Sequence, residues 1–132
     1  MVQRQDMLGL LLSSCPSFVP SWTAGEERYY LDAGGSFLYY VALGDFARHL
    51  VQLALAGKVE EFPTVFEVVE RLHVEGDHYV REAATIGLLE GIQNNASHTS
   101  LDQSFFEPYL GPESRKWWDR LNDFWAGKTP FV

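Results

Sequence analysis

Two histidines and two carboxylates lie within six positions of the sequence, at His73, Glu75, Asp77 and His78. Imidazole and carboxylate groups this close together could bind a metal ion or exchange protons with a substrate. The spacing is unfavourable, because the histidines are five residues apart with Gly76 between them, whereas zinc-binding pairs usually lie four apart on one helix. A small metal-binding or hydrolytic enzyme that uses His73, Glu75 and His78 is therefore an alternative, not the first hypothesis.

The ends of two helices explain the same segment. Gly76 can end one helix and Asp77 can begin the next, where its side chain would accept hydrogen bonds from free amide groups. Its negative charge suits the N-terminal end of a helix, and His73 suits the C-terminal end of the preceding one. Such a cap stabilises a helix by about 0.5–2 kcal/mol. We therefore predict no catalytic residue, no metal ligand and no cofactor.

Other residue types that carry chemistry occur without a supporting pattern. Cys15 and His49 could form a thiol–imidazole pair, but no sequence neighbour of Cys15 would lower the pKa of its thiol. Asp119 and Asp123 are four residues apart, as on the solvated face of a helix. The sequence contains no phosphate-binding loop, no GxSxG motif and no dinucleotide-binding fingerprint. We therefore expect a protein that is not an enzyme.

The composition is that of a folded, acidic protein. With 132 residues, of which 46% are hydrophobic, the chain suits one compact domain over residues 1–132. Its formal net charge of −8 argues against nucleic-acid binding and permits attraction to a basic partner. The single cysteine excludes an internal disulfide and favours a cytoplasmic location. No stretch approaches the roughly 18 apolar residues of a membrane span, and the apolar segment before LLSSC (11–15) is too short for a lipoprotein signal.

Five segments have the apolar spacing of helices: residues 3–14, 37–56, 60–74, 78–94 and 112–126. The third and fourth are separated by a very short turn, so they should pack antiparallel, as in one unit of a HEAT-like repeat. Small residues on one face of the fourth segment should allow close packing against the third, and QNNASHTS (93–100) should form a polar loop. The sequence therefore predicts an all-α fold, a single-domain bundle of about five helices with a HEAT-like antiparallel helix pair.

The region between the first two helical segments is expected to be irregular. Pro16 and Pro20 should break regular structure, and RYYLDAGGS (28–36) is interpreted as an extended loop. Ser36 is the expected N-cap of the helix that follows. Gly57 is expected to end that helix in the left-handed conformation.

Negative charge is concentrated in one part of the chain. Residues 60–90 contain eight acidic residues and two arginines, whereas residues 111–132 contain three acidic and four basic residues. An acidic face can keep a protein soluble, or it can attract a basic partner and speed association. Trp117 and Trp118 are adjacent, so both cannot face the same core, and a surface tryptophan is a common interface anchor. We predict a partner-binding surface formed by Glu60, Glu61, Glu67, Glu70, Asp77, Glu82 and Trp118.

Several motifs resemble those of a family of small bacterial all-α proteins. The sequence has GDF at 44–46, then GD-x-x-V-R at 76–81, then GLLEGIQ at 87–93, and LGPESRKWWDRLNDFW (110–125) also looks typical of the family. The likeness covers about residues 37–126. Proteins of this kind look like immunity proteins of bacterial toxin systems, including contact-dependent growth inhibition.

The resemblance implies a cytoplasmic inhibitor that binds one cognate toxin domain and blocks it. The charge and composition, not the resemblance, predict a basic partner, no nucleic acid or membrane as partner, and no cofactor. The shared motifs are mainly structural, so they transfer neither a catalytic residue nor a contact residue. A scaffold or regulatory subunit unrelated to toxins is the other interaction protein that the same features allow.

Overall fold

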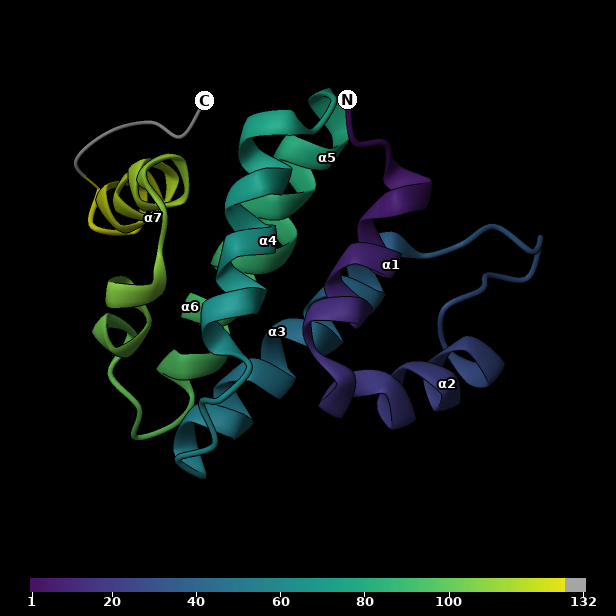
Figure 1. Ribbon diagram of the computed structural model, residues 1–132, viewed down its shortest axis with the longest axis horizontal. Helices are drawn as coiled ribbons and strands as arrows, with labels where there is room; N and C mark the ends of the chain where they lie inside the picture. The colour runs from purple at the N-terminus through teal and green to yellow at the C-terminus, as the bar shows by residue number, and fades with distance from the viewer. Residues whose placement is uncertain (128–132) are drawn as a thin grey trace.

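The computed structural model describes residues 1–127, and in this part of the chain the fold is all-α, as predicted. The seven α-helices are α1 (Arg4–Ser14), α2 (Val19–Arg28), α3 (Tyr39–Leu55), α4 (Phe62–Glu75), α5 (His78–Glu82), α6 (Glu90–Ser97) and α7 (Pro112–Trp125). They are joined by two 3₁₀ segments, η1 (Pro16–Phe18) and η3 (Gln103–Tyr109), and by a π-helical segment, η2 (Ala83–Leu89). Within residues 1–127 there is no β-strand, and no helix is long and apolar enough to span a membrane. Figure 1 shows α4 between α1 and α7.

The chain between α1 and α3 is more regular than expected. Irregular structure was the wrong expectation for α2, because Pro20 lies in its first turn and Pro16 begins η1, positions that need no amide hydrogen. The extended loop that follows is present. It carries an isolated bridge between Leu31 and Phe37, and Gly35 has a φ of 85°, which glycine adopts without strain.

Of the two predicted ends of α3, only the C-terminal one is confirmed. Gly57 follows the helix with a φ of 72°, the left-handed conformation expected there. Ser36 is not the N-cap, because the helix begins at Tyr39 and Leu38 occupies the cap position without a side-chain hydrogen bond. The N-terminal end of α3 therefore lacks the side-chain cap that the sequence suggested.

Residues 78–97 form one continuous helical run made of α5, η2 and α6. The run continues to Ser97, so the polar loop expected over residues 93–100 is wrong in its first half. The π-helical turns of η2 are wider than α-helical ones, and such segments are often found at functional sites.

Small residues in this run allow close packing against α3. A Cβ atom at Gly87 would lie 2.8 Å from Cδ1 of Leu43, and one at Gly91 would lie 3.0 Å from Cβ of Ala47. The sequence suggested the segment at 60–74 as the close neighbour. The glycines instead face α3, which is apolar around much of its circumference and is central in the fold.

The turn between α4 and α5 is held by the N-terminal residues. Val2 donates its amide to the Glu75 carbonyl at 2.8 Å and accepts the Asp77 amide at 2.9 Å. Asp77 caps α5, because its Oδ1 accepts the Val80 amide at 2.9 Å, which confirms the predicted cap. A Cβ atom at Gly76 would overlap the Leu72 carbonyl oxygen, so this turn requires glycine.

Buried aromatic side chains attach η3 and α7 to α4. The Phe106 ring lies 5.7 Å from that of Phe62, 5.9 Å from that of Phe66 and 6.5 Å from that of Trp118, measured between centroids. All four side chains are almost fully buried. Because large aromatic residues dominate core energetics, this cluster fixes α7 beside α4 and the α5–η2–α6 run.

Candidate functional site

A ridge on the α5–η2 run separates two grooves. His78, Glu82 and Ile86 follow one another at intervals of four residues, which places them on one face of the helix. Each of these three residues lines both grooves. The volumes of the grooves are about 710 Å³ and 630 Å³. We refer to His78, Glu82 and Ile86 as the ridge.

The first groove has tyrosine walls and is called the tyrosine groove. Besides the ridge, it is lined by Arg4, Tyr40, Asp77 and Tyr79. The Arg4 guanidinium lies 3.8 Å from the centroid of the Tyr79 ring, and the Tyr40 and Tyr79 rings are 6.1 Å apart. Burial raises the pKa of both tyrosines, so each presents a neutral hydroxyl group.

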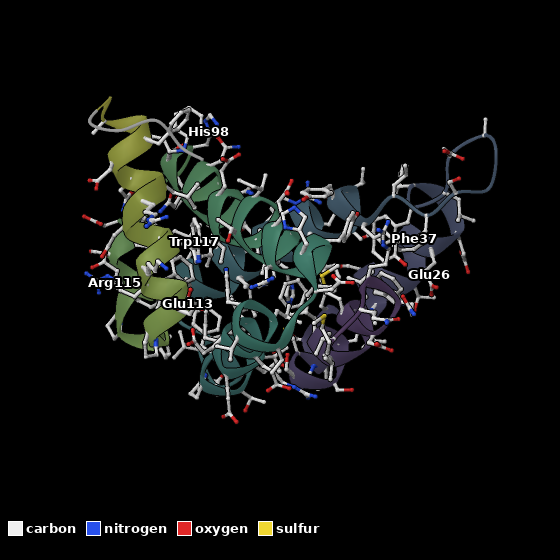
Figure 2. The ribbon with its side chains drawn as sticks, turned by 90° about the horizontal axis from the view of Figure 1, so that it is seen from above. Glu26, Phe37, His98, Glu113, Arg115 and Trp117 are labelled. Carbon is white, nitrogen blue, oxygen red and sulfur yellow. The ribbon has the colours of Figure 1, made fainter. Side chains whose placement is uncertain are left out.

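The second groove lies between the α5–η2 run and α7 and is called the tryptophan groove. Besides the ridge, it is lined by His73, Arg81, Thr85, Glu113 and Trp117. Figure 2 shows Trp117 and Glu113 on the side of α7 that faces the α5–η2–α6 run, whereas Arg115 points away. One wall of the tryptophan groove therefore comes from the α5–η2 run, and the opposite wall comes from α7.

His73 lies at the bottom of the tryptophan groove and is buried. Its Nδ1 is 2.9 Å from the Val69 carbonyl oxygen, and its Nε2 is 3.0 Å from Thr85 Oγ1. Burial lowers the pKa of His73, which favours the neutral ring. Both ring nitrogens therefore have a hydrogen-bond partner inside the protein.

The Glu70 carboxylate fixes the outer wall of this groove by capping α7 from another helix. Its Oε2 accepts the Glu113 amide at 3.0 Å, and its Oε1 accepts the Ser114 amide and hydroxyl, both at 2.8 Å. Gly111, the N-cap residue of α7, has no side chain to make these bonds, and a Cβ atom there would crowd Glu70. Burial works to raise the pKa of Glu70, but these hydrogen bonds outweigh it and hold the pKa below its usual range. Glu70 therefore positions Glu113 and Trp117.

Glu61 has a similar role on the other side of α4. Ser17 donates its amide to Glu61 Oε2 at 3.0 Å and its hydroxyl to Oε1, and His49 Nε2 lies 2.8 Å from the same hydroxyl. In a catalytic triad the carboxylate binds the far nitrogen of the imidazole, whereas here it binds the serine itself. Burial raises the pKa of Cys15 to about 11, the opposite of an activated thiol. The cluster ties η1 to α3 and α4.

The acidic residues predicted to bind a partner lie in three environments. Glu60, two residues before α4, and Glu67, within α4, are exposed. Asp77 and Glu82 line the grooves, where Asp77 also caps α5. The remaining two, Glu61 and Glu70, are partly buried and accept hydrogen bonds from residues far away in the sequence.

Trp118, the tryptophan predicted to be a surface anchor, is fully buried. Its indole N–H donates to Glu107 at 3.2 Å, and its ring packs near Phe106. That prediction is wrong, because the phase of α7 turns Trp118 into the core. The adjacent Trp117 is the one that lines a groove.

The alternative metal or hydrolytic site is not assembled. Glu75 pairs with Arg71 at 3.2 Å and does not line the tryptophan groove, which His73 and His78 share. His73 is committed to Val69 and Thr85, while the His78 side chain is 90% exposed and lies 3.4 Å from Glu82. Within residues 1–127 no group of three or more His, Cys, Asp or Glu side chains is arranged to hold a metal ion.

Comparison with known proteins identifies one family. The family described as "Domain of unknown function (DUF7674)" matches residues 8–126. No curated protein and no solved structure matches the chain. Because the family match spans most of the 132 residues, the chain belongs to the DUF7674 family.

Proposed function

We propose that this protein is an immunity protein, which binds a cognate bacterial toxin domain in the cytoplasm and neutralises it without a cofactor. The motif resemblance of residues 37–126 supports the class of partner. The ridge and the two grooves beside it support recognition of a protein surface. In this proposal the toxin is occluded, and the DUF7674 chain makes or breaks no bond.

The ridge is the observation that carries the proposal. It borders both grooves, so a partner that contacts the ridge also reaches the residues that line them. The groove walls contain Arg4, Tyr40, Tyr79 and Trp117. Arg, Tyr and Trp are the residue types most enriched among side chains that dominate protein–protein binding energy.

Two exposed acidic residues, one just before α4 and one within it, have a different role in this proposal. Glu60 and Glu67 lie outside the grooves, and we assign them to attracting a basic toxin and not to contact. Charges of this kind raise association rates more than they lower dissociation rates, and the effect weakens with salt. Replacing both residues with lysine should therefore slow association and leave dissociation nearly unchanged. A faster dissociation rate with an unchanged association rate would refute this role.

The HEAT-like interpretation also belongs to this proposal. α4 and α5 are connected through Gly76 and Asp77 alone and pack against each other. In helical-repeat proteins such pairs present extended binding surfaces. The ridge would be the binding surface of this pair.

Two other functions give different results in simple assays. A scaffold or regulatory subunit would use the same ridge on a partner that is not a toxin. A metal enzyme using His73, Glu75 and His78 would contain a stoichiometric metal ion, and a chelator would lower its melting temperature. Elemental analysis of the purified chain tests the metal enzyme directly.

Co-expression tests the proposal. The partner is the C-terminal domain of the large secreted protein expected to be encoded immediately upstream. We expect this domain to arrest growth of a bacterial host when expressed alone, and this chain to restore growth and to co-purify with the domain. A domain that remains toxic in the presence of this chain, or that fails to co-purify with it, would contradict the proposal.

A further inference from the structure

We infer that the tryptophan groove receives a lysine or arginine side chain of the partner, with its charge at Glu82 and Glu113 and its stem against Trp117. This inference rests on the proposed function, because it names the chemistry of the partner at the same site. It adds to that function a specific contact, between a basic side chain of the partner and the acidic residues of α5 and α7.

The groove offers carboxylates from both of its walls. Glu82 comes from α5 and Glu113 from the first turn of α7, and both line the groove. Glu70 fixes the backbone of Glu113, because its carboxylate accepts the Glu113 amide at 3.0 Å. A cationic group that enters the groove therefore meets carboxylates on two sides, at least one of them on a fixed backbone.

The internal partners of these carboxylates are easily displaced. Glu82 lies 3.4 Å from His78, whose side chain is 90% exposed, and Glu113 lies 3.5 Å from Lys116, whose side chain is 48% exposed. Exposed pairs of this kind contribute little to stability, at most about 1 kcal/mol. A cation that is desolvated between the two walls would compete well against them.

The Trp117 ring already attracts cations. The Lys116 ammonium lies 5.3 Å and the Arg120 guanidinium 4.8 Å from the ring centroid. Indole rings attract cations over their faces, and Ile86 supplies an apolar surface for the methylene stem of a long side chain. At about 630 Å³ the groove has the size of pockets that hold whole small molecules, so one long side chain fits within it.

Arg81 allows a test of whether the group that enters the groove is positively or negatively charged. It lines the same groove, and its positive charge opposes an incoming cation but would favour an anion. A cationic occupant therefore predicts that Arg81→Gln strengthens binding and that Glu82→Gln and Glu113→Gln weaken it. An anionic occupant predicts the reverse for all three.

The experiment is an NMR titration of the full chain with two blocked tripeptides, acetyl-Gly-Arg-Gly-amide and acetyl-Gly-Glu-Gly-amide. We expect the arginine peptide alone to produce saturable shifts of the Trp117 indole and the Ile86 amide. The Glu82→Gln/Glu113→Gln variant should bind it about three- to tenfold more weakly, and Arg81→Gln about two- to threefold more tightly. Glu26→Gln, at the other end of the molecule in Figure 2, is the matched control and should bind like the wild type.

The outcomes separate this inference from the proposed function. Binding of the glutamate peptide, weaker arginine binding in Arg81→Gln, or shifts that do not saturate would each overturn the inference. The co-expression assay does not depend on these peptides, so a captured toxin with an unresponsive groove would refute the inference alone. A toxin that fails to bind while the arginine peptide saturates would refute the proposed function and leave the groove as a cation site.

Discussion

Replacing Glu70 with alanine should weaken the attachment of α7 more than any surface change on α4. The carboxylate accepts three hydrogen bonds from the start of α7, two from backbone amides and one from the Ser114 hydroxyl. Ser114 is fully buried, so its groups cannot recover the lost bonds from bulk water. Glu113 is only partly buried, so water can replace part of what its amide loses.

The expected loss is about 2–4 kcal/mol of unfolding free energy. A hydrogen bond to a charged group contributes about 1.5–3 kcal/mol, and one at a partly exposed position contributes less. The loss of an N-cap alone costs about 0.5–2 kcal/mol. For a chain of this size the change corresponds to a melting temperature lower by about 6–15 °C. Glu70→Gln keeps one acceptor oxygen and should lose about half as much.

Thermal and urea unfolding followed by circular dichroism measure this loss. The matched control is Glu67→Ala, one turn earlier on α4, where the side chain is exposed and the change should stay within about 0.5 kcal/mol. Hydrogen exchange at the Ser114 amide should accelerate in Glu70→Ala. Equal stability of Glu70→Ala and Glu67→Ala, with unchanged exchange at Ser114, would refute the capping role of Glu70.

Three further predictions concern the interior. Gly76→Ala should lower the unfolding free energy by about 1–3 kcal/mol in urea titrations, because the new Cβ would overlap the Leu72 carbonyl oxygen; wild-type stability would contradict the strict need for glycine there. Burial lowers the pKa of His73 below its ordinary 6.5, so the unfolded chain binds more protons than the folded one near this pH. The unfolding free energy should therefore fall as the pH drops below about 6.5, and His73→Gln should flatten this dependence. An unchanged dependence of the unfolding free energy on pH in His73→Gln would exclude His73 as its source. Burial raises the pKa of Cys15 to about 11, so iodoacetamide at pH 8 should leave the folded protein unmodified and label it in urea; rapid labelling of the folded protein would contradict this burial.

Local features of the fold could be predicted from the sequence, because their causes lie within a few residues. Asp77 was expected to cap α5 from its position after a glycine, and it does. Gly57 was expected in the left-handed conformation, and it adopts it. The helix α2 was missed because Pro20 can either break a helix or begin one, and the sequence alone does not distinguish these roles.

The tertiary contacts of two of the acidic residues could not be predicted from the sequence. Glu70 caps a helix that begins more than forty residues later, and Glu61 accepts hydrogen bonds from Ser17 across a similar separation. No pattern among neighbouring residues in the sequence predicts hydrogen-bond partners that are this far apart in the chain. The choice between Trp117 and Trp118 depended on the phase of α7 against Phe106, which the sequence does not give.

The sequence contains one signal of the ridge. His78, Glu82 and Ile86 recur every four residues along a helix whose other faces are apolar or small, a spacing typical of one exposed stripe. The two grooves beside that stripe could not be predicted, because their outer walls come from α1, α3 and α7.

The most direct test of the central claim, that the ridge is the toxin-binding surface, is the affinity of the toxin domain for Glu82→Arg measured by calorimetry beside Glu26→Arg. The two variants change the net charge equally, and Figure 2 shows Glu26 at the end of the molecule opposite Trp117. We predict that Glu82→Arg weakens binding by at least about tenfold, while Glu26→Arg stays within about twofold of the wild type. Equal affinity of the two variants would show that the toxin binds elsewhere.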